Sequence, residues 1–413
     1  MKAPRYCLRN VTVLDVENGA VQHKKSVIIS SEKIEAILDS TADLNAEMIN
    51  ADGLYLCPGL IDCHVHLFLD SSASPRTNFI DSDTSQRMKV ARTNAQVAIE
   101  AGITTMRDCG APAPLIFSLQ REIDKGETRG PHIICCGHPL TRPKGHCHFM
   151  GAEVTTVKDV RRVIEDQLKQ GASFVKIMAS GGGLTPGTKP CEADFSLELM
   201  RASAEVAHAN KALVTAHCHA TESISRTIDA RLDMIEHVSF VEPSGRYRYD
   251  EGVAQRIKDE GIVVSPTVIG ALRIAECYRK TGKTHNPSDV SAIERLEGRL
   301  INTGHFHRMG MKIIGGSDSG CTDTPFNSLV DEVLVYGQVG MSNAEALRTV
   351  TSNSAKYMNL PKLGEIKTGF QADLVLLAGN PLEDLNVLRR PLSVFKAGRL
   401  VHEAISLINQ HQA

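Results

Sequence analysis

Short runs that alternate apolar and polar residues occupy both ends of this 413-residue chain. Near the start lie "YCLRNVTVLDV" and "KSVIISSEKIEAILDS", and near the end lie "ADLVLLAGNP" and "PLSVFKAGRLV". Alternation with a period of two is typical of β-strands that bury one face, and Gly and Pro punctuate the runs as they do in turns. We therefore predict one small β domain, formed by residues 1–57 together with residues 361–413.

Residues 58–360 follow a different pattern, in which helical runs alternate with short apolar strands. One such unit is "VKDVRRVIEDQLKQGA", which has apolar residues at helical spacing and leads into "SFVKIMASGGG". About eight such units predict an α/β fold, a (β/α)₈ barrel of the TIM type. The alternative is an open doubly wound sheet, which is disfavoured because no GxGxxG follows the first strand. The turn "SGGG" lacks the Lys-Ser/Thr pair of a phosphate loop and is interpreted as a plain tight turn.

The first predicted strand of this region, "PGLIDCHVHLFLD" at residues 58–70, carries two histidines one residue apart. Residues two apart in a strand point to the same side, so His64 and His66 leave one face together. Two imidazoles placed in this way suit a single metal ion. A polar patch at the end of a strand is the plain alternative, and the motif alone does not decide between them.

Five more polar residues stand at the ends of predicted strands. Lys176 ends "FVKI", His217 and His219 end "LVTAHCH", His237 ends "MIEHV" and Asp318 ends "KIIGGSD". Each has an ordinary explanation on its own, such as a snorkelling lysine or a helix cap. In a barrel these ends converge on the axis, where unpaired burial of several polar groups is costly. Because bound metal removes that cost, the pattern predicts a metal centre.

Cysteines flank several of these histidines and are possible thiolate ligands. Strand alternation points Cys63 and Cys218 away from the histidines. We therefore interpret them as small buried apolar residues.

The loop "HPLTRPKGHCHFMG" is free of acidic residues and carries several groups that are positive or can take up a proton. These groups are Arg142, Lys144, His146 and His148. Because loops that follow barrel strands line the mouth of the site, this composition suggests an anionic group on the substrate. An ordinary solvated loop is the alternative.

Composition narrows the class of protein. The formal charge is −2, aromatic residues make up 4% and Trp is absent, which disfavours a binder of nucleic acid or of membrane surfaces. The sequence shows no apolar stretch of membrane-spanning length and no signal-peptide core at its N-terminus. The eleven cysteines are scattered without CxxC pairs, as expected for reduced thiols. We therefore expect a cytoplasmic enzyme that acts on a small molecule.

Several motifs together resemble the amidohydrolase superfamily. They are "PGLIDCHVH", "VKIMASGGG", "TAHCHA", "IEHVSF", "GGSDSG" and the closing "LGEIKTGFQADLVLLAGNPLED", which occur in order over nearly the whole chain. The pattern is similar to the branch that contains prolidases, Xaa-Arg/Lys carboxypeptidases and ochratoxin amidases. This resemblance implies a (β/α)₈ barrel beside a small β-sandwich made from both termini. It also implies a homo-oligomer.

The resemblance further implies a binuclear metal centre. His64, His66 and Asp318 are expected to hold one divalent ion, and His217 and His237 the other. Lys176 is expected to be carboxylated on its ε-nitrogen and to bridge both ions, most simply Zn²⁺, although Mn²⁺, Co²⁺ and Fe²⁺ suit similar ligands. A hydroxide between the metals is expected to be the nucleophile. Asp318 is expected to be the catalytic base that takes its proton and passes it to the leaving nitrogen.

Substrate contacts are expected from His146, which takes the place of the His in the family's "GGH" loop, with Lys144 in place of the first Gly. Lys144 and His219 are also predicted to contact substrate, and His219 shares a strand face with His217, so that one of these two histidines binds metal while the other meets the substrate. Where this branch tends to carry a Tyr after the seventh strand, the sequence has Ala271 in "SPTVIGALR". This departure indicates a different or larger substrate than a simple dipeptide.

We therefore predict a metal-dependent hydrolase of an amide C–N bond in an N-acyl amino acid or dipeptide-like substrate with a free carboxylate. The same centre would also serve a cyclic amide, an aryl urea or carbamate, or an ester or lactone. Lys176 disfavours a mononuclear deaminase, which usually lacks that bridge. A non-catalytic scaffold is disfavoured because all six ligands are present.

Overall fold

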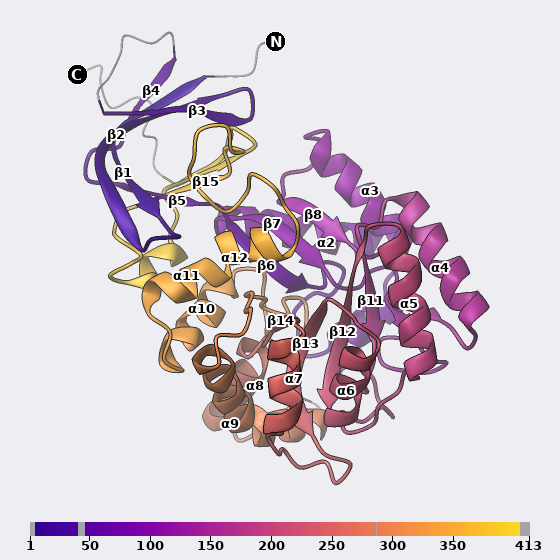
Figure 1. Ribbon diagram of the computed structural model, residues 1–413. Helices are drawn as coiled ribbons and strands as arrows, with labels where there is room; N and C mark the ends of the chain where they lie inside the picture. The colour runs from indigo at the N-terminus through magenta and orange to yellow at the C-terminus, as the bar shows by residue number, and fades with distance from the viewer. Residues whose placement is uncertain (1–4, 40–45, 286, 405–413) are drawn as a thin grey trace.

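The computed structural model describes residues 5–39, 46–285 and 287–404. A β-rich region lies at one end of the molecule, and a larger body of alternating helices and strands adjoins it (Figure 1). The outer ends of the predicted β domain, residues 1–4 and 405–413, lie outside the described residues. Within those described residues, no helix has the length and hydropathy needed to cross a bilayer.

Strands from both ends of the chain share one eight-stranded sheet, in the order β17-β16-β15-β5-β1-β2-β3 with β4 paired to β1. The junction is the antiparallel pairing of β15 with β5, in which Leu374 lies opposite Pro58. The sheet therefore confirms that the two termini fold together, whereas its packing as a sandwich stays a prediction. The strands are β1 (Tyr6–Asp15), β2 (Ala20–Ser30), β3 (Lys33–Leu38), β4 (Glu47–Asn50), β5 (Tyr55–Pro58), β15 (Leu374–Leu377), β16 (Ser393–Lys396) and β17 (Arg399–Glu403).

Strand β15 of this terminal sheet is buried on both of its faces, which explains its run "LVLL". Leu374 and Leu376 belong to a core formed within the terminal region. Val375 and Leu377 point the other way and join the large core of the α/β body. Successive side chains of a strand alternate between faces, so one strand supplies both cores. The sheet is thereby fixed against the body that carries the site.

The α/β body contains two groups of parallel strands. One sheet has the order β6-β7-β8 and the other β10-β9-β11-β12-β13-β14. All of the pairings within these two sheets are parallel, as a βαβ architecture requires. The strands are β6 (Leu60–Val65), β7 (Ile103–Asp108), β8 (His132–Cys135), β9 (Leu140–Thr141), β10 (Ala152–Glu153), β11 (Phe174–Met178), β12 (Leu213–Ala220), β13 (Met234–Val241) and β14 (Val263–Ser265).

Residues 312–319, the predicted eighth strand, run between β14 and β6. The amide of Val264 donates to the Lys312 carbonyl at 2.9 Å, and that of Cys63 donates to the Gly315 carbonyl at 3.0 Å. A Cβ at Gly316 would lie 2.7 Å from that of His64, so only glycine allows this close approach. Isolated bridges rather than a regular strand form here. The arrangement fits a TIM-barrel domain, and full closure of the barrel stays a prediction.

Helices between the strands begin and end at the expected signals. In α4, Thr156 and Asp159 form a capping box, and Gly171 ends the helix with a φ of 120°. Val160 and Ile164 face the core from this helix. The helices are α1 (Pro75–Asp81), α2 (Thr84–Glu100), α3 (Ala113–Asp124), α4 (Val157–Gln170), α5 (Leu197–Ala209), α6 (Thr221–Asp229), α7 (Glu251–Asp259), α8 (Ile269–Thr281), α9 (Pro287–Arg308), α10 (Leu329–Gln338), α11 (Asn343–Thr349), α12 (Ser352–Tyr357) and the 3₁₀ turn η1 (Leu385–Arg389).

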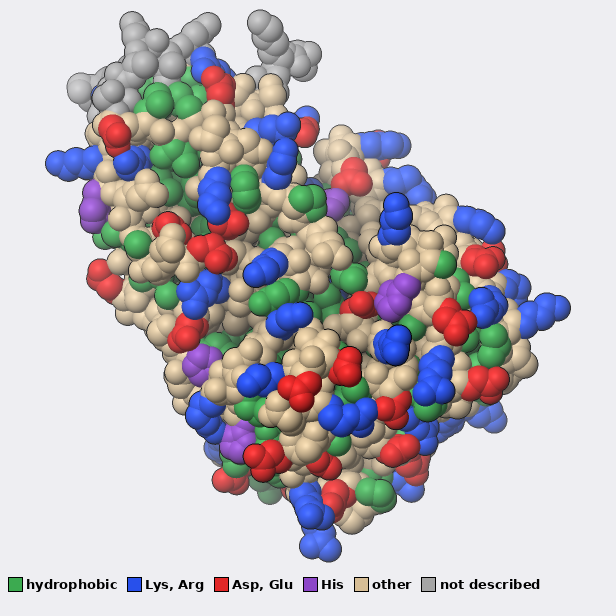
Figure 2. Space-filling model, in the orientation of Figure 1, with side chains coloured by type: hydrophobic (Ala, Val, Ile, Leu, Met, Phe, Trp, Pro, Cys, Tyr) green, Lys and Arg blue, Asp and Glu red, His purple; other side chains and the backbone are tan. Residues whose placement is uncertain are grey.

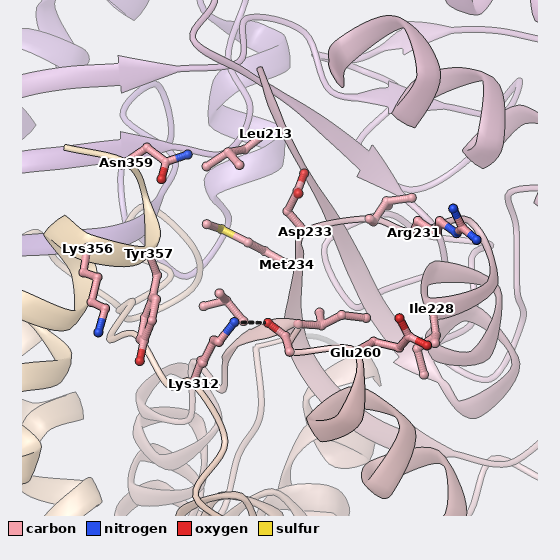
Figure 3. A pocket seen from close by; sticks show the side chains of 14 residues that line it. Leu213, Ile228, Arg231, Asp233, Met234, Glu260, Lys312, Lys356, Tyr357 and Asn359 are labelled. Carbon is pink, nitrogen blue, oxygen red and sulfur yellow. Dashed lines mark hydrogen bonds between the residues drawn. The ribbon is translucent and has the colours of Figure 1, made fainter. Parts of the chain in front are cut away.

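Basic and acidic side chains are intermixed over the face seen in Figure 2, in keeping with the small net charge. A cavity of about 480 Å³, here called the amino-end cavity, lies where β12, β13 and β14 begin. Leu213 and Met234 open these strands and line it (Figure 3). Lys312 spans its edge and donates from Nζ to the Gly261 carbonyl at 2.7 Å.

Candidate metal centre

A second cavity, of about 520 Å³, lies at the other end of the same strands, and we call it the carboxyl-end cavity. All six predicted metal ligands line it, and they come from five strand ends or the turns that follow, with His64 and His66 sharing the end of β6. Five are buried and the sixth, Asp318, has 22% of its side chain exposed. The six are His64, His66, Lys176, His217, His237 and Asp318.

Asp318 faces the two histidines of the first strand. Its Oδ1 lies 3.5 Å from Nε2 of His64 and 3.5 Å from Nε2 of His66. The backbone fixes this position, since the amide of Asp318 donates to the His64 carbonyl at 2.8 Å. Asp318 has a φ of 59°, in the left-handed region that a non-glycine residue occupies at a cost. Convergence of the His-x-His pair is thus found, together with a carboxylate that faces both rings.

His217, His219 and His237 form a second group, in which one ring nitrogen from each lies within 4.8 Å of the other two. The ring centroid of His217 lies 4.5 Å from those of both His219 and His237. His219 and His237 stack at 4.7 Å, and Nδ1 of His219 contacts the Ser239 hydroxyl at 2.8 Å. His219 therefore lies as close to this group as a ligand would, and its role as metal ligand or substrate contact stays a prediction.

Lys176 is the residue whose surroundings fit a metal centre most sharply. Its side chain is 1% exposed, and its Nζ has no hydrogen-bond partner among the described residues. A buried ammonium without partners is very costly, whereas a carbamate between metal ions has all of its oxygens satisfied. The donor set of imidazoles, one carboxylate and this lysine therefore suits divalent ions.

A buried ion pair that the sequence patterns did not reveal holds His64 in place. Glu236 accepts from Nδ1 of His64 at 2.9 Å through one oxygen. Its other oxygen accepts from Arg107 at 2.5 Å and from the Thr215 hydroxyl at 2.6 Å. Such a partner fixes the tautomer and aims the opposite nitrogen, Nε2, at Asp318. The available signal was a charge inside each of two apolar strands, "ITTMRD" and "MIEHVSFV".

The other histidines are oriented in similar ways. Nδ1 of His66 lies 3.2 Å from the Gly110 carbonyl, and Nδ1 of His237 lies 2.5 Å from the Thr267 hydroxyl. Both contacts leave Nε2 for a ligand. His217 differs, because its Nε2 lies 3.3 Å from the Gly181 carbonyl and Nδ1 stays available.

Burial shifts these groups toward the protonation states that metal binding needs. It lowers the pKa of His64 to about 4 and the pKa values of His217, His219 and His237 well below the ordinary value. Burial alone would raise the pKa of Asp318, but the facing His64, His66 and Lys176 lower it overall. At neutral pH these four imidazoles are therefore neutral and Asp318 is a carboxylate, the forms that bind metal.

The two predicted substrate residues of the "PKGHCH" loop, His146 and Lys144, lie in different places: only His146 lines the carboxyl-end cavity. His146 is buried in the carboxyl-end cavity with its ring 4.6 Å from that of His217, and its Nδ1 has no partner among the described residues. A Cβ at Gly182 would lie 2.5 Å from the His146 ring, which explains the glycine in "SGGG". Lys144 is exposed and outside the lining of this cavity, so its substrate contact stays a prediction.

Three arginines line the carboxyl-end cavity, and sequence reasoning missed them. Arg76 comes from α1, and Arg295 and Arg299 lie one turn apart on α9. Arg299 donates to the Pro266 carbonyl and the Thr267 hydroxyl, both at 3.1 Å, and so braces the turn that holds His237. Burial and then neighbouring Arg299 lower the pKa of Arg295 to about 10. Arg295 and Arg299, here called the cationic wall, bring two positive charges to the cavity. Like charges at this position favour the binding of an anionic group.

Ala271 lines the same cavity and is 3% exposed, so the position expected to carry a Tyr is at the site. The cysteine predictions are also confirmed. Cys63 contacts the Ser354 hydroxyl at 3.0 Å and Cys218 the Thr227 hydroxyl at 3.3 Å, both away from the histidines. Cys321 is a thiol that the patterns did not single out, and its Sγ lies 3.4 Å from Asp318 Oδ1.

Comparisons with known proteins identify the family of this chain. The Amidohydrolase family model matches residues 55–401. Ochratoxinase from Aspergillus niger is 26% identical over 423 residues, which cover 91% of this chain and 83% of that protein. A prolidase structure complexed with N-methylphosphonate-L-proline is 29% identical with a TM-score of 0.86, and the match covers 97% of this chain and 100% of that chain. A Xaa-Pro dipeptidase with bound methionine is 25% identical with a TM-score of 0.85 at the same coverage. This chain belongs to the amidohydrolase family and is a hydrolytic enzyme of the amidase or peptidase kind.

Proposed function

We propose that the protein is a binuclear metal hydrolase that cleaves the amide C–N bond of an N-acyl amino acid or dipeptide-like substrate with a free carboxylate. The observation that carries the proposal is the convergence of six potential ligands on one cavity, where the buried amine of Lys176 has no hydrogen-bond partner among the residues that the structure describes. Similarity to an ochratoxinase and a prolidase supports the same class of bond.

Members of the amidohydrolase family generally use a metal centre, and the donor set described above fits one. His64, His66 and Asp318 would hold one ion, His217 and His237 another, and carboxylated Lys176 would bridge them. When bound, divalent ions such as Zn²⁺ supply Lewis acidity, which polarises a carbonyl and lowers the pKa of water.

The chain's own residues would then position and move the proton. Asp318 would accept it at a carboxylate oxygen from the attacking water and deliver it to the leaving amide nitrogen. Glu236 would keep Nε2 of His64 aimed at this carboxylate, because it already binds the opposite ring nitrogen. The buried walls of the cavity would limit competing water.

The cationic wall supports a substrate that carries a carboxylate. His146 brings a buried nitrogen with no partner among the described residues, and Arg295 and Arg299 bring positive charge to the same cavity. Because Ala271 leaves space where the resembled branch tends to have a Tyr, we propose that the acyl portion or side chain is larger than in simple dipeptides.

A hydrolysis screen on metal-reconstituted protein tests this proposal. N-acyl amino acids and dipeptides are paired with their carboxamide forms, and lactams, aryl ureas, carbamates, esters and lactones complete the panel. Cleavage of free acids at least tenfold faster than of their carboxamides is expected, since a charged hydrogen bond contributes about 1.5–3 kcal/mol. Cleavage of neutral or cyclic substrates alone would contradict the proposed carboxylate pocket. If no member of the panel were cleaved, the proposed amide hydrolysis would itself be contradicted.

Several properties of the whole molecule belong to the same proposal. We expect a closed barrel over residues 58–360 and a β-sandwich over residues 1–57 and 361–413. We also expect a cytoplasmic homo-oligomer that acts on a small molecule and binds neither nucleic acid nor membrane.

A further inference from the structure

Three potential metal ligands meet at the rim of the carboxyl-end cavity, away from the histidine cluster. Cys277 lies on α8, His285 on the connection to α9, and Asp323 on the loop after residues 312–319. Sγ of Cys277 lies 3.6 Å from Nε2 of His285, and that nitrogen lies 2.9 Å from Oδ2 of Asp323. The three ligand atoms all lie within 4.8 Å of one another.

The geometry of this rim cluster differs from that of a proton relay. In a relay of the Cys-His-Asp kind, histidine contacts the thiol through one ring nitrogen and the carboxylate through the other. Here a single nitrogen, Nε2 of His285, faces both groups. Tetrahedral zinc with bonds of about 2.3 Å to sulfur and about 2.0 Å to nitrogen separates these two atoms by about 3.5 Å. The observed distance of 3.6 Å is close to that separation.

We propose that Cys277, His285 and Asp323 bind a zinc-type divalent ion at the mouth of the site, with water as the remaining ligand. Thiolate, imidazole and carboxylate together suit Zn²⁺ and related borderline ions, whereas Mg²⁺ and Ca²⁺ prefer oxygen alone. The site is open to an ion from solvent, since the side chains of His285 and Asp323 are 31% and 30% exposed. It is distinct from the histidine centre and does not rest on that centre's chemistry.

The ion would join three separate parts of the cavity wall. Asp323 stands between Thr322 and Thr324, which both line the carboxyl-end cavity. The amide of His285 donates to Oδ2 of Asp289, another lining residue, at 2.9 Å. Helix α8, which carries Cys277, adds Ala271 and Ile274 to the lining. An ion held by all three elements would stabilise the mouth of the cavity, because it binds the assembled rim and not a separated one.

Metal content tests the proposal without any measurement of turnover. Wild-type protein and the Cys277→Ser variant are loaded with Zn²⁺, freed of excess ion and analysed by mass spectrometry of the metal. Wild type is expected to retain one more equivalent per chain than Cys277→Ser. Cys191, another partly exposed free thiol, supplies the matched control, and Cys191→Ser is expected to retain the wild-type content.

Cobalt substitution gives a spectroscopic signature of the same site. Co²⁺-loaded wild type and Cys191→Ser are expected to show a thiolate-to-cobalt charge-transfer band that Cys277→Ser lacks and His285→Gln weakens. Equal zinc content in wild type and Cys277→Ser, or a charge-transfer band that survives Cys277→Ser, would overturn the proposal. Both readouts hold whether or not the protein hydrolyses any substrate in the screen, so this inference and the proposed function fail separately.

Discussion

Two cavities of similar size lie at opposite ends of the same strands, and their chemistry differs. The carboxyl-end cavity has about 520 Å³ and the amino-end cavity about 480 Å³. β12 contributes His217 to the first and Leu213 to the second, and β13 contributes His237 and Met234 in the same way. Size and strand content therefore do not distinguish them.

What distinguishes the two cavities is where their charged groups are solvated. Arg231, Glu260 and Lys312 line the amino-end cavity and are exposed, so water satisfies them. His64 and Lys176 line the carboxyl-end cavity and are each 1% exposed. Buried polar groups need partners, and those that lack one within the chain point to a bound group. The comparison teaches that desolvated polar groups, rather than the presence of a cavity, distinguish the end of the strands that carries the candidate metal centre.

The sharpest way to break this comparison is to neutralise one carboxylate at each end. Asp318→Asn is expected to lower kcat by about 10²–10⁴-fold, the range for loss of a general acid–base group. Asp233→Asn at the amino-end cavity is the matched control and is expected to keep turnover near wild type. Steady-state kinetics and circular dichroism measure the two variants. Near-normal kcat in Asp318→Asn would remove the proposed proton transfer.

Lysines offer a second matched pair. Lys176→Met is expected to weaken metal binding by about 100-fold or more, since even indirect support of ligands is worth 10–100-fold. Lys312→Met, which removes an exposed donor to the Gly261 carbonyl, is expected to leave metal content unchanged. Titration with a competing chelator measures both. Wild-type protein depleted of carbon dioxide should also take up metal more slowly, and added bicarbonate should restore the rate. A rate of metal uptake that does not depend on bicarbonate would contradict a carboxylated lysine.

The pH dependence of stability separates the cavities further, because the amino-end lining contains no histidine. In metal-free protein, burial lowers the pKa of His64 from 6.5 to about 4. The folded state then binds fewer protons than the unfolded state between these values, so stability is full above pH 6.5 and falls as pH drops toward 4. The shift corresponds to about 3 kcal/mol. Thermal unfolding of chelator-treated protein should show this loss.

A histidine control localises that acid sensitivity. His64→Gln is expected to reduce the fall in melting temperature between pH 6.5 and 4, while His217, His219 and His237, whose pKa values are also lowered, retain the rest of it. His208→Gln removes a partly exposed imidazole that contacts Asp233 of the amino-end lining at 3.0 Å, and it is expected to leave the slope intact. Equal slopes in wild type and His64→Gln would assign the sensitivity elsewhere.

The convergence of the candidate metal ligands was predictable because it follows from local rules. Strand alternation placed His64 and His66 on one side, and parallel strands brought their carboxyl ends to one edge. The same rule predicted that Cys63 and Cys218 face away, which their contacts with α12 and α6 confirm. The terminal sheet was also predictable from the sequence, since apolar and polar residues alternate along its strands and turns with Gly and Pro separate them.

The site residues that the sequence patterns did not predict are held in place by residues that are distant in the sequence. In the sequence, Glu236 and Arg107 are each a single charged residue inside an apolar strand. Their ion pair can be recognised only once β7 and β13 are placed in the fold. Arg295 and Arg299 belong to α9, whose position over the cavity no local pattern specifies. Lys144 shows that the sequence can also suggest a residue that the fold keeps away from the cavity. It lies two residues before the buried His146, yet its side chain is exposed.

The smallest effect concerns the cationic wall. Arg295→Gln removes one positive charge from the carboxyl-end cavity while it keeps most of the side-chain volume. We expect KM for a free-acid substrate to rise about tenfold, because one charged hydrogen bond is worth about 1.5–3 kcal/mol. The carboxamide form should be affected far less, since it has no charge to lose. Arg231→Gln in the amino-end lining should change neither value. An equal loss on both substrate forms would make Arg295 a structural residue of α9 and leave His146 as the carboxylate contact.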